Sequence, residues 1–107
     1  MIDVERLQFR PYVVPAVAQA GLLLVNGPCY VNTIATTVVG AVGYQYQIID
    51  GVTSQGLIAF QGDDHPVTLN NLRLVFQNGL YFISAGAPAT FAGWTIVAAV
   101  IPPSMSY

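Results

Sequence analysis

The sequence has very few charged residues. Of its 107 residues only 7% are Asp, Glu, Lys or Arg, whereas about 25% is usual for a soluble domain. Lysine is absent, and the only arginines are Arg6, Arg10 and Arg73. Nucleic-acid binding depends on clustered Lys and Arg that neutralise phosphates, and attraction to anionic lipid depends on the same residues. The composition therefore excludes nucleic acid as the main partner and gives no basis for binding a charged membrane.

Cysteine and histidine each occur once, as Cys29 and His65. A lone cysteine excludes an intramolecular disulfide. A lone histidine leaves both a catalytic thiol and a zinc site without partners at the usual ligand spacing. We therefore expect Cys29 to be a small buried hydrophobic residue, and we expect neither a metal nor another cofactor.

Long apolar runs and targeting signals are also missing. A membrane helix needs about 18 or more apolar residues, and Pro15, Gln19 and Gly21 interrupt the best candidate. The first ten residues carry four charges and lack the apolar centre of a secretory signal. These absences predict a protein that is made and used in a cytoplasm and has no membrane partner.

Apolar residues, by contrast, are abundant. They make up 54% of the chain, against about 45–50% in an ordinary domain. With so few charges, much of the surface is expected to be neutral polar or apolar, and large exposed apolar patches mark contacts with other proteins. The composition favours an obligate oligomer or a subunit of a larger assembly. The alternative is a monomer covered by Gln, Asn, Thr and Ser.

The apolar runs are short, rich in Val, Ile, Thr, Tyr and Phe, and separated by ten glycines and seven prolines. This is the pattern of strands joined by turns. The predicted strands cover Glu5–Val13, Gly21–Val25, Tyr30–Val39, Tyr44–Ile49, Leu57–Gln61, Leu72–Phe76, Leu80–Ser84 and Trp94–Ile101. We expect an all-β fold, a single jelly-roll-like β-sandwich of about 7–8 strands over residues 1–107.

The first of these runs contains Pro11. Because proline cannot donate a hydrogen bond to a neighbouring strand, this segment is predicted to be an edge strand or an arm. We expect residues 1–19 to form an extended N-terminal arm that reaches a neighbouring subunit.

Asn78 and Gly79 form the pair preferred in type I′ turns. They predict a tight hairpin that joins Leu72–Phe76 to Leu80–Ser84, with Leu72, Leu74 and Phe76 pointing inward.

The last strand is apolar on both faces. Trp94, Ile96 and Ala98 alternate with Val97, Ala99 and Ile101, whereas a strand of a two-sheet sandwich buries only one face. Either the N-terminal arm or another subunit must cover the second face, and we favour another subunit. The predicted interface residues are Phe9, Arg10, Tyr12, Val13, Val97 and Ile101.

The cluster Asp63, Asp64 and His65 is the most polar loop of the chain. Such residues bind Ca²⁺ or Zn²⁺ when further ligands converge on the ion, but consecutive loop residues seldom point at one ion. We interpret the cluster as a solvated turn and expect no metal site. Asp50 precedes Gly51, where a carboxylate usually organises its own turn, which argues against a glycosidase pair of Asp50 and Asp63.

Motifs of the common nucleophiles and of phosphate-binding loops do not occur, so we expect no catalytic residues. Five tyrosines could form an aromatic surface that binds sugars, but tyrosine is as common in sheets and protein interfaces. They are Tyr12, Tyr44, Tyr46, Tyr81 and Tyr107.

Between Tyr44 and Val100 the order of strands and turns is distinctive. Tyr46–Gly51 leads into Gly56–Phe60, and Leu74–Tyr81 precedes Gly86 and the closing strand from Trp94. This stretch resembles small β-sandwich structural proteins of tailed bacteriophages, often capsid cement or decoration subunits or parts of head and tail fibres. The resemblance implies no catalytic residues, and the first 43 residues lie outside it.

The expected function is therefore that of a virion structural protein, a capsid cement or decoration subunit that stabilises the phage head. Its expected partners are itself, as a homotrimer, and the major capsid protein, with no nucleic acid, membrane or small-molecule substrate. Its expected location is the capsid of the virion, after synthesis in the host cytoplasm. The alternatives are a module of a phage fibre or tail that binds carbohydrate or a host surface, and a small hydrolase that uses Asp63, Asp64 or His65.

Overall fold

The computed structural model describes residues 4–15, 21–36, 45–63, 65, 67–85 and 93–103. Within these residues the chain forms nine strands and one short 3-10 helix, Val4–Arg6. The strands are β1 (Arg10–Pro15), β2 (Leu22–Asn26), β3 (Cys29–Thr36), β4 (Gln45–Asp50), β5 (Leu57–Gly62), β6 (Val67–Leu69), β7 (Leu74–Phe76), β8 (Gly79–Ala85) and β9 (Gly93–Val100).

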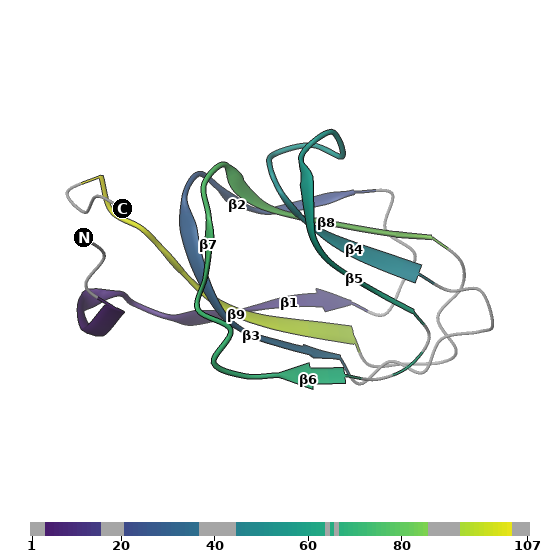
Figure 1. Cartoon of the computed structure of the whole chain (residues 1–107), viewed down its shortest axis with the longest axis horizontal. Helices are drawn as coiled ribbons and strands as arrows, with labels where there is room; N and C mark the ends of the chain where they lie inside the picture. Colours follow the sequence, from purple (N-terminus) through teal and green to yellow (C-terminus); the bar gives the residue numbers. More distant parts are fainter. Residues whose placement is uncertain are drawn as a thin grey trace.

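The strands form two antiparallel sheets that pack face to face (Figure 1). The first sheet has the order β1-β9-β3-β6, with β7 also paired to β3, and the second has the order β2-β8-β4-β5. The pairing is nested, since β1 pairs with β9, β2 with β8, β3 with β6 and β4 with β5. The expected all-β sandwich is confirmed.

An aromatic cluster joins the two sheets at the centre of the core. Trp94 of β9 lies in the first sheet, and its ring centroid is 4.7 Å from that of Phe82 and 5.4 Å from that of Tyr46, both in the second sheet. All three side chains are 2% exposed or less. Rings of this size dominate the burial of apolar area in small domains, so these contacts hold the sheets together.

Gly62, the last residue of β5, allows this cluster to pack. A Cβ atom built on Gly62 would lie 2.5 Å from the Tyr46 ring. Any larger residue would therefore push Tyr46 out of its place in the core, where overpacking destabilises.

The described part of the N-terminal segment packs against the sandwich of the same chain. Residues Arg10–Pro15 form β1, an edge strand paired to β9, which is one of the two forms expected from Pro11. Before it, Leu7 packs on Tyr30, Ala99 and Ile101 on the outside of the first sheet. Residues 1–3 and 16–19 of the expected arm lie outside the described residues.

This packing changes the explanation of the two-sided last strand. Its second face was expected to be covered by another subunit, yet near Ala99 and Ile101 it is covered by Leu7 of the same chain. The physical reason is that the 3-10 helix Val4–Arg6 turns the chain back over the end of β9, and Leu7 follows directly.

The turn at Asn78–Gly79 is not the predicted hairpin. Leu72, Leu74 and Phe76 do pack against the core, as expected, but β7 pairs with β3 and β8 with β2 and β4. The turn therefore carries the chain from one sheet to the other. A type I′ turn needs positive φ at both central residues, and among the described residues only Asn71, Arg73 and Gly27 have positive φ.

The cause lies in Asp50, at the end of β4. Its two carboxylate oxygens accept hydrogen bonds from the backbone N–H groups of Gln77 at 3.0 Å and Asn78 at 2.8 Å. Asp50 was expected to organise its own turn with Gly51, but it organises this distant turn instead. The short strand β6, Val67–Leu69, was not among the predicted strands.

Candidate functional site

The outer face of the first sheet is one candidate for contact with a partner. Val14, Trp94 and Ile96 point into the core, so their neighbours along β1 and β9 point outward, since side chains alternate along a strand. The outer face consists of Pro11, Val13, Thr33, Ala35, Thr68, Thr95 and Val97, brought together by the register of β1, β9, β3 and β6. No charged side chain belongs to this set.

Two of the predicted interface residues lie on this face. The side chain of Val13 is 67% exposed, and Val97 is half-buried opposite Pro11. Ile101, in contrast, is only 4% exposed beneath Leu7. It therefore has little surface left to offer a partner.

The other three predicted interface residues gather at the end of the molecule that carries the 3-10 helix. Arg10 holds its guanidinium 4.9 Å from the ring centroid of Tyr12, a cation–π contact. The ring of Phe9 meets that of Tyr30 edge-on at 5.8 Å and is 37% exposed. Tyr12 itself is half-buried against the core.

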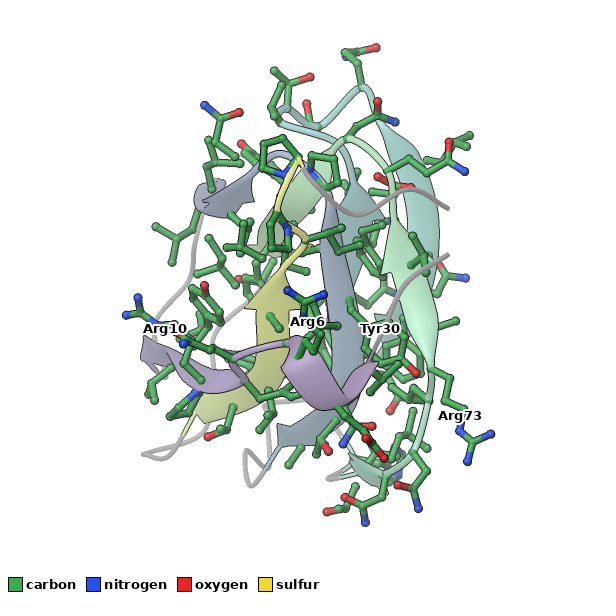
Figure 2. The ribbon with its side chains drawn as sticks, turned by 90° about the vertical axis from the view of Figure 1, so that its left-hand side faces the viewer. Arg6, Arg10, Tyr30 and Arg73 are labelled. Atoms are coloured by element: carbon green, nitrogen blue, oxygen red, sulfur yellow. The ribbon has the colours of Figure 1, made fainter. Side chains whose placement is uncertain are left out.

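All three arginines of the chain are found toward this same end (Figure 2). Arg6 and Arg10 border a shallow depression of about 380 Å³, together with Leu7, Gln8, Tyr12, Val100 and Pro102. Within the described residues none of the arginines forms a salt bridge. The depression is open, and its charged groups lie at the surface.

A polar cleft of about 540 Å³ opens near β5 and β6, which lie at one side of the sandwich (Figure 1). It is lined by Gln45, Tyr46, Gln47, Phe60, Gln61, Gly62, Asp63, His65 and Val67. The three glutamines project from the outer side of β4 and β5, since Gln47 pairs with Gln61 and Gln45 is two residues from Gln47. The lining of the cleft thus combines neutral amides with two aromatic residues, Tyr46 and Phe60.

Asp63 and His65 form a local turn at the mouth of this cleft. His65 Nδ1 lies 2.9 Å from Asp63 Oδ1, and the His65 backbone N–H donates to the same oxygen at 3.1 Å. The hydrogen bond from the His65 ring, followed by that from its backbone N–H, lowers the pKa of Asp63 below its ordinary value. Both side chains are more than half exposed, in keeping with the expected solvated turn; Asp64 lies outside the described residues.

The acidic residues do not form the catalytic pair considered above. Asp50 pairs with Leu57 at the start of β5, whereas Asp63 follows the end of β5. Six residues of extended strand therefore separate Asp63 from the end of β5 that lies beside Asp50, a distance of roughly 20 Å. The two carboxylates of a glycosidase pair are only ~5–9.5 Å apart. Within the described residues, no group of three or more His, Cys, Asp or Glu side chains is placed to hold a metal ion.

Cys29 behaves as the expected core residue. It is fully buried between the sheets. Burial, and then the nearby Asp50 carboxylate, raise the pKa of its thiol to about 12. A protonated, inaccessible thiol is a poor nucleophile and metal ligand.

Two features were missed by the sequence reasoning. One is the row of glutamines, for which the signal was the spacing of Gln45 and Gln47 on one face of a predicted strand. The other is β5, whose outer edge pairs with no described strand and which exposes Leu57 and Ile58. The alternation of its sequence could not show that it would end a sheet.

Comparisons with protein-family models, with curated proteins and with solved structures found no match to this chain. In the described ranges the one helix is the three-residue turn Val4–Arg6, and none there is long and apolar enough to cross a membrane. The described residues present three surface features: an uncharged sheet face, an exposed sheet edge and a polar cleft.

Proposed function

We propose that this protein is a structural subunit that docks against other protein subunits through the outer face of its first sheet. The observation that carries the proposal is that this face bears no charged side chain while Val13 stays 67% exposed. Charged residues are depleted at the centres of protein interfaces, and an uncharged apolar patch on a soluble surface marks such a contact.

The strand order supports a jelly-roll form of the sandwich. With β7 set aside, eight strands form two four-stranded sheets in which the first strand pairs with the last and the second with the next-to-last. Double-sheet jelly rolls of eight strands are used in viral capsid and lectin domains. Both settings agree with a protein that works by contact.

The setting we propose is the capsid of a tailed phage, where the protein would decorate the head across junctions of the major capsid protein, alone or as a homotrimer. The resemblance of Tyr44–Val100 to phage structural proteins supports this. Position on the outside follows from charge, because a domain with three arginines has no affinity for packaged DNA.

The test uses a single exposed position. Val13→Lys places a charge on the most exposed apolar residue of the proposed face, while Val13→Thr keeps the shape and the strand preference and serves as the matched control. The full chain and both variants are incubated with empty heads, and occupancy is measured by quantitative gel analysis after sedimentation of the heads. We expect Val13→Lys to lose at least tenfold in affinity and Val13→Thr to stay within about threefold of the unmodified chain.

Equal binding by Val13→Lys would refute the proposed face, and failure of all three proteins to bind heads would refute the capsid setting. Deletion of residues 1–19 is not a suitable test of this face, because it would remove β1 and the buried Val14 from the fold.

A second candidate function is the binding of neutral sugars in the polar cleft. Its support is the combination of Gln45, Gln47 and Gln61 with Phe60 and Asp63, since amide and carboxylate groups pair with hydroxyls and ring faces pack on the apolar side of a sugar. A glycan array separates the candidates. Binding that is lost in Gln47→Ala and retained in Val13→Lys would favour the cleft, and no binding would exclude it.

A further inference from the structure

The edges of the two sheets are protected to different degrees. A sheet edge presents unpaired N–H and C=O groups, and proteins usually guard it with lysine, proline, short strands or bulges. In the first sheet, β1 carries Arg10, Pro11 and Pro15, while β6 and β7 have only three residues each. The second sheet ends in β2 and β5, which contain neither proline nor charge, in a chain without lysine.

Of these two edges β5 is the more open. It is six residues long, against five for β2. Leu57 is 76% exposed and Ile58 is 53% exposed, whereas the most exposed apolar residue of β2 is Leu23, at 39%. The one protective device on β5 is a bulge, in which Ala59 has no partner between Ile58 and Phe60 on β4.

We propose that the free edge of β5 is a self-association site, where β5 of a second copy of this chain adds in antiparallel orientation and joins the two second sheets into one. Strand addition to an exposed edge is an established mode of recognition, in which the main chain supplies the hydrogen bonds. The inference rests on the proposed function only in treating the chain as an assembly subunit, and it uses a different surface.

Charge favours a second copy in the antiparallel orientation. Leu57–Gly62 has no charged residue, so two copies meet without repulsion in any register. Asp63 follows one end of β5, and the uncharged turn from Gly51 to Gly56 precedes the other. An antiparallel pair places Asp63 of each copy near the turn of the other, where the Asp50 carboxylate lies one strand farther away on β4 and already accepts hydrogen bonds from Gln77 and Asn78. A parallel pair would set the two Asp63 carboxylates side by side on adjacent strands.

The proposed contact between two copies of β5 is small, so the dimer is expected to be weak. Two strands of six residues meet over only about 20 Å, which buries less than the ~800 Å² per partner of a standard interface. The exposed Leu57, Ile58 and Val52 add apolar area at its ends. The expected product is a weak and reversible dimer with two-fold symmetry, the isologous arrangement that closes without forming fibres.

The first test is sedimentation velocity of the full chain from about 10 μM to about 1 mM, a range suited to weak association. The unmodified chain is expected to shift reversibly from monomer to dimer. The double variant Leu57→Lys/Ile58→Lys puts lysines on the edge and is expected to weaken the dimer at least tenfold. Val4→Lys is the control, since Val4 is also exposed but lies on the 3-10 helix, outside both proposed contact surfaces, and it is expected to dimerise like the unmodified chain. Val13→Lys is measured beside it to report on the docking face of the first sheet.

The outcomes separate this inference from the proposed function. A chain that stays monomeric at about 1 mM, or dimers unaffected by the two lysines, would overturn the inference and leave the docking face untouched. Association abolished by Val13→Lys alone would assign self-contact to the first sheet. Should the double lysine variant lose its cooperative thermal unfolding, the milder pair Leu57→Gln/Ile58→Thr takes its place.

The second test reads the orientation of the strands. Ala59 lies near the middle of β5, so Ala59→Cys is expected to give a disulfide-linked dimer with oxidised glutathione, because only groups near the two-fold axis come within the Cα distance of a disulfide. Leu57→Cys, at the end of the strand, is expected to remain uncrosslinked. The native Cys29 does not interfere, since it is buried. Equal crosslinking at both positions would indicate parallel strands and contradict the proposed pair.

Discussion

The two sheets share one core, yet they differ in where they expose apolar residues. The first sheet exposes them on its flat outer face, around Val13, and its edges carry prolines or are short. The second sheet exposes them along an edge, at Leu57 and Ile58 of β5. A face binds through side-chain packing, whereas an edge binds through main-chain hydrogen bonds. The two proposed contacts therefore depend on two different kinds of interaction.

The largest expected effect on stability comes from removing the aromatic contact between the two sheets. Trp94→Ala removes the first sheet's side of the aromatic cluster with Phe82 and Tyr46. We expect a loss of about 3–5 kcal/mol in the free energy of unfolding, measured by urea denaturation. Val13→Ala, on the exposed face of the same sheet, is expected to stay within about 0.5 kcal/mol. Similar losses in both variants would mean that the sheets do not depend on this cluster.

The next effect concerns the turn that carries the chain from the first sheet to the second. Asp50→Ala removes the acceptor for the N–H groups of Gln77 and Asn78, which is expected to cost about 1–3 kcal/mol. Asp50→Asn keeps one side-chain oxygen and is expected to cost less. Denaturant unfolding at neutral pH ranks the variants, and an unchanged Asp50→Ala would contradict the role given to this carboxylate.

A pH effect links the two sheets through Cys29 and Asp50. Because burial and Asp50 raise the pKa of the thiol from 9.0 to about 12, the thiol ionises in the unfolded chain before it ionises in the folded one. Its contribution to stability is therefore complete below about pH 9 and is lost between pH 9 and 12, by at most about 1.4 kcal/mol per pH unit. Cys29→Ala is expected to show a shallower decline over this range, and parallel declines would disprove the link.

The smallest effect is expected from a substitution that makes the free edge of β1, in the first sheet, resemble that of β5, in the second. Pro11→Val restores a backbone N–H to β1 and is expected to increase self-association by a few fold, through a contact that survives Leu57→Lys/Ile58→Lys. Sedimentation of the combined variant measures this contact. If the combined variant stays monomeric, proline is not what keeps β1 from pairing.

Much of the fold could be predicted because it depends on local pattern. The period-2 alternation and the turn residues predicted β2, β4, β5, β8 and β9 to within a few residues, and they predicted the inward side of Leu72–Phe76. The β7–β8 hairpin was wrong because a carboxylate 27 residues away, Asp50, overrides the local preference of Asn78-Gly79. No local pattern carries such a contact.

The candidate surfaces could be predicted only in part, for the same reason. Val13 is exposed as an interface residue must be, but Ile101 is buried because Leu7, far away in sequence, folds over it. The glutamines of the cleft come from two strands whose register aligns Gln47 with Gln61. Residues that share a surface through strand pairing cannot be grouped from their spacing along the chain.

By itself the sequence determined the class of this protein: an all-β domain, short of charge, without paired cysteines, and with 54% apolar residues. These properties follow from composition and from alternation along single strands. Only the tertiary structure decided which apolar residues remain at the surface, because exposure depends on which strand lies beside which. Leu7, folded over the end of β9, buried Ile101, and the strand order left the face around Val13 and the edge of β5 open.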